Sequence, residues 1–272
     1  MDFFIRSVDI STDIQGIRET HGGDDHWGSD LACCNSQKTR LANGFFIQVA
    51  VSGKQIIGHA EWAVSDEAEH KYLYLGMLQA RAGYQRMGVG TKLLETGAAY
   101  ANEIGCAFLR TMPNAESAAF YQKNGFVKTG KSNSTLTLKT TDAPLRTAAR
   151  VDKIPFAAIK TLPFVAGLYQ HSSGHMWNIY NALSESDDRT VFSYRIGGSY
   201  VNIGAFMPTD RASVLCWTDE ITDGLITEIL AAAGGLGYKY LNFCVLSEYV
   251  PLFDAFEYTM SDDHDIFMER RL

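Results

Sequence analysis

The residues best suited to chemistry form a glycine turn between two regular segments. The run Tyr72–Ala80 is typical of a strand, and Gln85, Gly88 and Gly90 then follow in the order Q-x-x-G-x-G before an amphipathic run. Glycine lets an anion approach the backbone closely. The first N–H groups of a helix lack intrahelical partners and attract negative charge. The turn therefore predicts a phosphate-binding site, at whose rim Gln85 or Arg86 can add a side-chain donor.

Two common phosphate-binding loops do not fit this turn. Gly83 and Gly88 have the first spacing of a Walker A loop, but Val89 stands where that loop needs lysine. Gly88 and Gly90 begin a dinucleotide-binding pattern, but Leu93 occupies the place of its third glycine. A glycine-rich helix start that serves packing alone remains the structural alternative.

The elements around the turn alternate between strand and helix, which favours an α/β protein with a mixed sheet. Hydrophobic periodicity predicts the following elements in the first part of the chain: a strand at residues 3–8, helices at Ser11–Thr20 and Trp27–Leu41, a hairpin turning at Ser52–Gly53, a strand at Tyr72–Ala80, a helix at Gly88–Ile104, a strand at Ala107–Thr111, a helix at Glu116–Lys123 and a strand at Thr135–Lys139.

The second part of the chain reads as a diverged copy of the first. A polar segment with two prolines, KTTDAPLRTAARVDKIP, has the character of a linker. Beyond it we expect a helix near GHMWNIYNAL, three strands, a helix at Thr222–Ala233, a strand at YKYLNFCV, a helix at YVPLFDAFEY and a final strand. Both parts show the same order of elements with nearly equal spacing: a helix, a glycine, a strand and a further helix that carries phenylalanine. This order indicates an internal repeat. The expected domains are residues 1–142 and 143–272.

Charge and composition exclude several classes of protein. The 272 residues carry a net charge of −7, with 14 basic and 15 acidic residues up to Leu145 and 10 and 16 beyond it. No basic stripe is present, so nucleic acid is not an expected partner. No apolar stretch is long enough to cross a bilayer, and the N-terminus has no secretory pattern. Five cysteines without a C-x-x-C motif argue against a disulfide framework and for a cytoplasmic protein.

Two motifs together resemble the GNAT superfamily of acyl-coenzyme A-dependent N-acyltransferases. GYQRMGVGTKLL is similar to the pyrophosphate loop and following helix of that family. NAESAAFYQKNGFV is similar to its next signature, in which Asn precedes a short helix, an aromatic–Tyr pair ends it and Gly-Phe opens a strand. The resemblance covers roughly Phe3 to Lys139. It departs at Ala80 and Ala82, where the family usually has a β-branched residue and a proline, and this leaves the geometry of the acyl site open.

The resemblance implies acetyl-CoA as co-substrate and no metal. Backbone N–H groups of Leu78–Ala80 are then expected to bind the thioester carbonyl, with Gly76 supporting a bulge that frees them. Tyr121 takes the position of the acid that protonates the departing thiolate, and Asn114 the position that contacts the pantetheine arm. The implied cofactor-binding residues are Leu78, Gln79, Ala80, Gln85, Arg86, Met87, Gly88, Val89, Gly90, Thr91, Asn114 and Ser117. A water-exposed tyrosine and a simple helix cap are the structural alternatives for Tyr121 and Asn114.

The proton acceptor and the acceptor pocket are less defined by the sequence. Glu61 is the candidate general base and His59 the weaker one, because the two alternate on one strand and share a face; a solvated glutamate is the alternative. The segment HGGDDHWGSD corresponds to the region that lines the acceptor pocket in the family. Its carboxylates are candidates for holding a cationic amine, although they could also form a solvated turn: Asp24, Asp25 and Asp30. A metal site at this segment is disfavoured, since H-x-x-D-D-H has no standard ligand spacing.

These observations predict a cytoplasmic N-acetyltransferase that moves an acetyl group from acetyl-CoA to the primary amine of a small-molecule or peptide acceptor by direct attack in a ternary complex. Thr222 and Asp223 replace the glycine turn in the second part, which we therefore expect to bind no cofactor. The alternative is a non-catalytic acyl-CoA-binding sensor or assembly module. The sequence leaves the acceptor and the oligomeric state, including a homodimer, open.

Overall fold

The computed structural model describes residues 2–22, 30–65, 70–167, 172–182, 190–205, 209–261 and 266–272. The chain divides into two compact units, one made of Met1–Val127 with Met268–Leu272, and the other of Lys128–Phe267. The boundary expected from the sequence, between residues 142 and 143, falls within the second unit.

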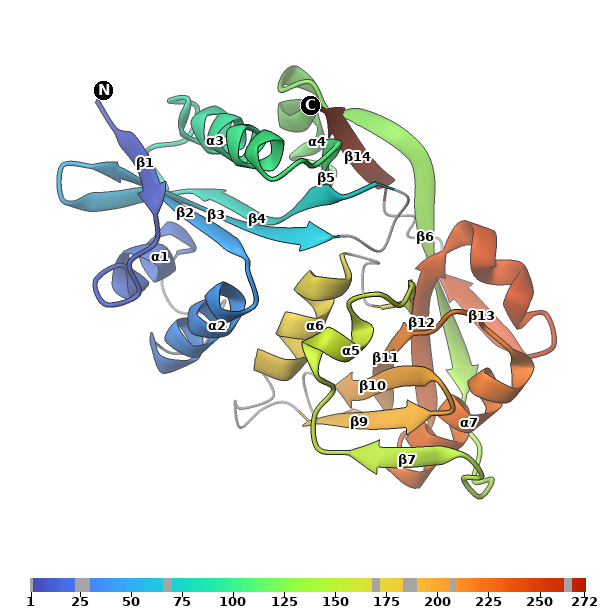
Figure 1. Cartoon of the computed structure of the whole chain (residues 1–272). Coiled ribbons are helices and arrows are strands. Elements are labelled where there is room, and N and C mark those ends of the chain that lie inside the picture. Colours follow the sequence, from blue (N-terminus) through green and yellow to red (C-terminus); the bar gives the residue numbers. More distant parts are fainter. Residues whose placement is uncertain are drawn as a thin grey trace. The chain divides into compact units, whose positions relative to one another are not determined.

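The first unit is a mixed sheet with helices on both faces (Figure 1). Its strands are β1 (Phe4–Ser7), β2 (Phe46–Ser52), β3 (Gln55–Ser65), β4 (Tyr72–Ala80), β5 (Phe108–Thr111) and β14 (Ile266–Arg271), in that spatial order. Its helices are α1 (Ile14–Thr20), α2 (Asp30–Ala42), α3 (Val89–Glu103) and α4 (Ala118–Lys123). Neighbouring strands run antiparallel except β4 and β5, which are parallel. The helices α3 and α4 lie on one face and α1 and α2 on the other.

Helix α3 packs very closely on β3, and small residues make this possible. A Cβ added at Gly97 would lie 2.2 Å from the Trp62 ring, and one at Gly58 would lie 2.5 Å from the Val89 side chain. The Trp62 indole is itself fixed, because it donates a hydrogen bond to Gln48 at 2.9 Å. The tight contact therefore determines where the N-terminus of α3 lies relative to the sheet.

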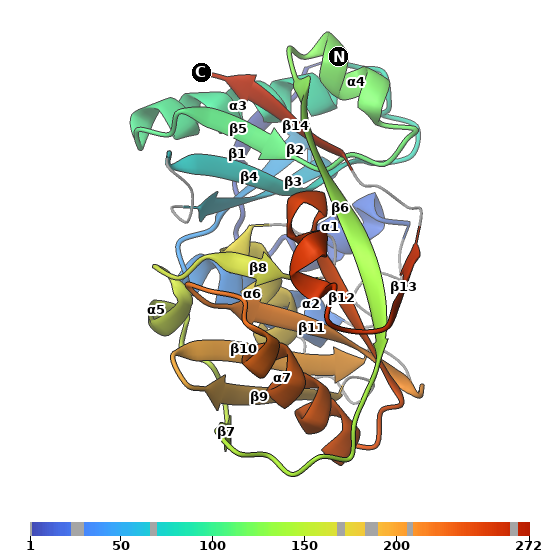
Figure 2. The same ribbon diagram turned by 90° about the vertical axis from the view of Figure 1, so that its right-hand side faces the viewer.

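The second unit repeats the strand arrangement of the first. Its elements are β6 (Val127–Lys139), β7 (Ala148–Val151), α5 (Phe156–Ile159), β8 (Phe164–Ala166), α6 (Ser173–Ala182), β9 (Thr190–Ile196), β10 (Ser199–Ala205), β11 (Arg211–Trp217), α7 (Asp223–Gly235), β12 (Tyr240–Leu246), η2 (Ser247–Phe253) and β13 (Tyr258–Ser261). The strands β9, β10 and β11 are antiparallel, and β11 and β12 are parallel, as in β2–β5. Figure 2 shows α7 on the opposite face of this sheet from α6.

The strand beside the parallel pair comes from a distant part of the sequence in each unit. β14, near the C-terminal end of the chain, pairs antiparallel with β5 of the first unit, and Arg110 and Glu269 join the two strands at 2.5 and 2.8 Å. β6, which follows α4, pairs with β12 and β13 of the second unit.

Two expected elements differ in the structure. YVPLFDAFEY forms a 3₁₀ segment, η2, and then the strand β13, rather than a helix. Pro251 lies inside this segment, and its missing N–H and bulky ring disfavour a regular α-helix. The linker-like segment contains a short strand, β7, which pairs with β9.

Candidate functional site

The glycine turn leads directly into the N-terminus of α3. Gly88 precedes α3 in the left-handed conformation, with φ of +82°, and Arg86 has φ of +62°. Within the described part of the chain, the backbone N–H groups of residues 85–91 donate no well-formed hydrogen bond to another protein atom. Gln85–Gly88 are exposed, whereas Val89 is buried against the core. The turn thus presents a row of available N–H donors at a helix N-terminus, which is suited to an anion.

The strand before the turn is separated from its parallel neighbour over its second half. β4 and β5 pair only from Tyr72–Leu75 with Phe108–Thr111. The register of β3 on β4 shifts between Trp62↔Leu75 and Glu61↔Met77, so Gly76 is the extra residue of the predicted bulge. Beyond it, Met77–Ala80 remain paired with β3 but have no strand partner on the β5 side within the described residues. This opening exposes backbone groups of Leu78–Ala80, the segment expected to bind the thioester carbonyl.

After β5, Asn114 and Ser117 lie in the turn that precedes α4, and Tyr121 lies within α4. The Asn114 side chain accepts a hydrogen bond from the Ser117 N–H at 2.9 Å, and the Ser117 hydroxyl donates to the Asn114 carbonyl at 3.2 Å. Asn114 therefore caps the turn that leads into α4. The Tyr121 ring is buried against Phe120 and Phe126. Burial raises the pKa of Tyr121 to about 12, against a smaller opposing effect of its hydrogen bond with Thr111.

Glu61 lies at the centre of a buried polar cluster rather than in solvent. Its side chain is 1% exposed, and it pairs with Arg40 of α2, which is 3% exposed. The Gln37 amide donates to Glu61 Oε1 at 2.6 Å. Burial alone raises the pKa of Glu61, but the Arg40 guanidinium, His59 and the Gln37 hydrogen bond outweigh it and hold that pKa below its usual range. Glu61 is consequently an ionised carboxylate at neutral pH.

Arg40 and Gln37 are the residues of this cluster that sequence reasoning missed. The signal was present, because Cys33, Gln37 and Arg40 follow one another at helical spacing and all three are buried on one face of α2. Two polar residues on the inward face of a helix indicate a buried partner. The sequence did not identify that partner, since Glu61 lies on β3.

The two histidines near this cluster lie close together. His21 Nε2 is 3.2 Å from His59 Nδ1, and His59 Nε2 is 3.5 Å from Glu61 Oε1. His59 and Glu61 share the face of β3 that α1 and α2 cover. His21 follows α1 at its C-terminal end and is half-buried.

The three candidate acceptor carboxylates are only partly described. Asp24 and Asp25 lie outside the described residues. Asp30 begins α2, is exposed, and forms an ion pair with Arg18 of α1. Its charge is therefore already matched by a protein cation.

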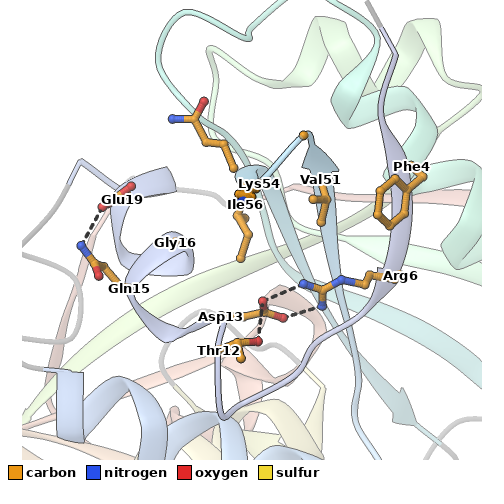
Figure 3. A pocket seen from close by; sticks show the side chains of 12 residues that line it. Phe4, Arg6, Thr12, Asp13, Gln15, Gly16, Glu19, Val51, Lys54 and Ile56 are labelled. Atoms are coloured by element: carbon orange, nitrogen blue, oxygen red, sulfur yellow. Dashed lines mark hydrogen bonds and ion pairs between the residues drawn. The ribbon is translucent and has the colours of Figure 1, made fainter.

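The first unit also has a large open groove, which the predicted site residues do not line (Figure 3). It has a volume of about 730 Å³ and is bounded by β1, α1 and the β2–β3 hairpin. Most of its charged lining groups bind one another or a neighbour: Arg6 pairs with Asp13 at 2.6 Å, and Glu19 pairs with Arg81 at 2.7 Å.

Neither a metal cluster nor a membrane span is found in the described part of the chain. Its histidine, cysteine, aspartate and glutamate side chains form no group of three or more suited to a metal ion. The segment His21–His26, where the sequence disfavours a metal site, lies mostly outside the described residues. Among the described helices, none has the length and apolar character needed to cross a membrane.

The second unit differs from the first at the equivalent place. β11 and β12 pair only from Arg211–Ser213 with Tyr240–Asn242, so they also separate. Here, however, β8 pairs with β11, and the N–H of Gly167 donates to the Cys244 carbonyl of β12 at 2.8 Å. The gap between the strands is thus bridged by the chain itself. At the start of α7, the Thr222 hydroxyl accepts a hydrogen bond from the Leu225 N–H at 3.2 Å.

Comparison with known proteins supports a family likeness for the first unit and a likeness of fold for both units. The model of the acetyltransferase (GNAT) family matches residues 16–126. No curated protein matches the sequence. A GCN5-related N-acetyltransferase from Kribbella flavida is 14% identical with a TM-score of 0.69, covering 100% of this chain and 71% of that chain. A GCN5-related N-acetyltransferase from Anabaena variabilis ATCC 29413 is 13% identical with a TM-score of 0.69, covering 99% and 73%.

A third solved structure matches over nearly the whole of both chains. It is a tandem GNAT protein from the clavulanic acid biosynthesis pathway, 12% identical with a TM-score of 0.59, covering 99% of this chain and 98% of its own. At these identities the structural likeness concerns the fold, and it extends to the second unit. Residues 16–126 are therefore similar to the GNAT acetyltransferase family, and the whole chain has the fold of a tandem GNAT protein, with a second, diverged unit of that fold.

Proposed function

We propose that this protein is an N-acetyltransferase that moves an acetyl group from acetyl-CoA to the primary amine of a cationic small molecule or peptide. One observation carries the proposal: the bulged strand β4, open on its β5 side, leads into a turn whose N–H groups donate no well-formed hydrogen bond to the part of the chain that the structure describes. A pantetheine arm fits an unpaired strand edge, and a diphosphate fits a helix N-terminus. A CoA thioester carries both groups in one molecule.

In this proposal the diphosphate binds the backbone of residues 85–91, with Gln85 and Arg86 at the rim. The thioester carbonyl accepts a hydrogen bond from an N–H of Leu78–Ala80, where charge develops as the amine attacks. Gly90 permits the close packing of the turn, because a Cβ there would lie 3.0 Å from the Phe120 ring. Asn114 and Ser117 lie at the start of α4, on the path proposed for the pantetheine arm.

Tyr121 is proposed as the acid that protonates the departing thiolate. Its raised pKa of about 12 keeps the phenol protonated at neutral pH, so it can donate a proton but not accept one. An amine of lysine-like pKa needs a separate proton acceptor, since holding it neutral at pH 7 costs about 4.6 kcal/mol. The burial and lowered pKa of Glu61 favour a supporting role in this step over direct proton abstraction.

The second unit is proposed to bind no acyl-CoA. β8 occupies the gap between β11 and β12, and Thr222 caps the helix end that corresponds to the phosphate turn. Titration calorimetry with acetyl-CoA should give one site per chain. Two sites per chain would contradict this part of the proposal.

A charge placed in the turn tests the cofactor site. Gly88→Asp puts a carboxylate where the diphosphate is proposed to bind, and aspartate tolerates a positive φ better than most residues. One like charge at about 5 Å costs about 3 kcal/mol at an effective dielectric constant of 20, before screening by salt. We expect acetyl-CoA to bind roughly 10- to 100-fold more weakly. Gly105→Asp is the matched control, because Gly105 has a similar φ of +74° at the other end of α3.

Release of free thiol from acetyl-CoA on a panel of primary amines tests the activity. The proposal requires turnover by the wild type, loss of rate at low acetyl-CoA in Gly88→Asp, and little change in Gly105→Asp. Binding of acetyl-CoA without turnover on any amine would instead identify a sensor or assembly module. Equal weakening by both substitutions would exclude the turn as the diphosphate site.

A further inference from the structure

A continuous line of polar side chains runs from the surface of the first unit to its buried carboxylate. His21 Nε2 lies 3.2 Å from His59 Nδ1, and the two rings meet edge to face with centroids 5.5 Å apart. His59 Nε2 lies 3.5 Å from Glu61 Oε1. His59 and Glu61 are almost fully buried, whereas His21 is half-buried. Only His21 is therefore placed to meet a molecule arriving from solvent.

The strand register places this line beside the proposed acyl site. His59 of β3 stands directly opposite Gln79 of β4, the middle residue of the segment Leu78–Ala80. Directly opposed residues of antiparallel strands point to the same face with Cβ atoms about 5 Å apart. The face that carries His59 is the one covered by α1 and α2, while α3 covers the other. A proton acceptor on this face lies on the side of the thioester opposite α3.

A buried carboxylate faces the histidine pair, and the charged groups of the neighbouring helix α1 are paired. Glu61 is anchored in ionised form by Arg40 and by the Gln37 amide, so its carboxylate is fixed toward His59. On α1, Arg18 is paired with Asp30. On α2, burial raises the pKa of Cys33 to about 12, so that thiol stays neutral. From the sheet, Val49 of β2 and Gln79 of β4 stand opposite His59, and neither is charged. Glu19 of α1, two residues before His21, pairs with Arg81 at 2.7 Å, and Glu61 is the carboxylate that lies against His59.

We propose that His21 is the general base of the acyl transfer, and that His59 and Glu61 are positioning residues that orient it and stabilise its protonated form. The inference rests on the proposed function. The ammonium N–H bond breaks as an N–H bond forms on the His21 ring, so one positive charge moves from the acceptor to the histidine pair. The neutral amine then forms the C–N bond, the C–S bond breaks, and the thiolate takes its proton from Tyr121. The nitrogen loses a second proton as the amide forms, and Tyr121 regains a proton in exchange with solvent. His21 afterwards releases its proton to solvent.

The experiment compares His21→Gln with His70→Gln, since His70 is an exposed histidine of the same unit. The acceptor is the primary amine that the thiol-release panel identifies as best, and the rate is measured at about pH 7 and about pH 10. We expect His21→Gln to lower kcat/KM by about 10²- to 10⁴-fold near pH 7. The loss should shrink at pH 10, where the amine is increasingly neutral without help. His70→Gln should behave as the wild type at both pH values.

Two further measurements separate a base from a merely structural residue. Imidazole added to His21→Ala should restore part of the rate near pH 7, because it can fill the vacated place. Transfer to hydroxylamine, which is largely uncharged at neutral pH, should fall by less than about tenfold in His21→Gln. A loss of equal size at both pH values and for both acceptors, without rescue by imidazole, would overturn the assignment.

Failure of the proposed function is distinguishable from failure of this inference. If the wild type transfers nothing to any amine, the acetyltransferase proposal fails. NMR titration of the His21 ring in the wild type and in His59→Gln then tests the histidine arrangement alone. His59→Gln should shift the pH midpoint of the His21 titration, and an unchanged midpoint would overturn the coupling. If the wild type is active and His21→Gln has the wild-type pH profile, only the assignment of the base fails.

Discussion

Removal of the Arg40 guanidinium should destabilise the first unit strongly at neutral pH. Arg40→Met keeps an unbranched apolar stem but leaves the Glu61 carboxylate, which is 1% exposed, with Gln37 and His59 as its remaining partners. Breaking a buried ion pair by removing one partner costs about 3–5 kcal/mol, because an uncompensated charge stays buried. Lys38→Met is the matched control, since Lys38 lies on the exposed face of the same helix.

The pH dependence of this loss has a definite sign. In the wild type the folded-state pKa of Glu61 lies below its unfolded value, so its contribution is present above about pH 4.3 and is lost as the pH falls through the folded pKa. Without Arg40, burial is the dominant effect and favours the protonated carboxyl in the folded state. The free energy of unfolding of Arg40→Met should therefore fall furthest below that of the wild type near pH 7, and this difference should narrow as the pH is lowered toward about 4.

Hydrogen exchange read by mass spectrometry is the suitable assay. A chain of two units can unfold in more than one step, and peptides from α2 and β3 report on the first unit alone. The double variant Arg40→Met/Glu61→Gln removes both charges and should be less destabilised than Arg40→Met. The reasoning is refuted if the free energy of unfolding of Arg40→Met stays within about 1 kcal/mol of the wild-type value near pH 7, or if the difference between the two grows on acidification.

Three further predictions follow from local geometry. Tyr121→Phe should lower kcat for thiol release about 10- to 100-fold and leave acetyl-CoA affinity within about threefold; unchanged kcat would exclude Tyr121 as the acid. Gly97→Ala should destabilise the first unit by about 1–3 kcal/mol in urea titration, because the new methyl group meets the fixed Trp62 ring; unchanged stability would show that α3 can shift. Thr222→Ala should cost the second unit about 1 kcal/mol by loss of the helix cap, with acetyl-CoA binding unaffected.

Local signals predicted the regions that carry the proposed cofactor site. The strand Tyr72–Ala80, the hairpin at Ser52–Gly53 and the bulge at Gly76 lie where the sequence indicated. Helix α3 begins one residue after Gly88. Each of these features is set by a few consecutive residues, since a glycine with positive φ or an alternating apolar run needs no distant partner.

Features that depend on distant partners could not be obtained in this way. The position of Glu61 on β3 was predicted, but its pairing with Arg40 joins residues 21 positions apart on two elements. The closeness of His21 and His59 spans 38 positions. The short strand β8 was also missed, because three residues are too few to show a period and its place beside β11 is decided by tertiary pairing.

The separation in sequence between β5 and its neighbour β14 affects the order in which the protein can form. Residues 108–111 are synthesised long before residues 268–271, so a nascent chain has an unpaired β5 edge during translation of everything between them. At about 5–20 residues per second this interval lasts roughly ten to thirty seconds. Completion of the sheet of the first unit is thus tied to translation of residues 268–271, and a ribosome stalled within the second unit holds a first unit with an open, aggregation-prone strand edge.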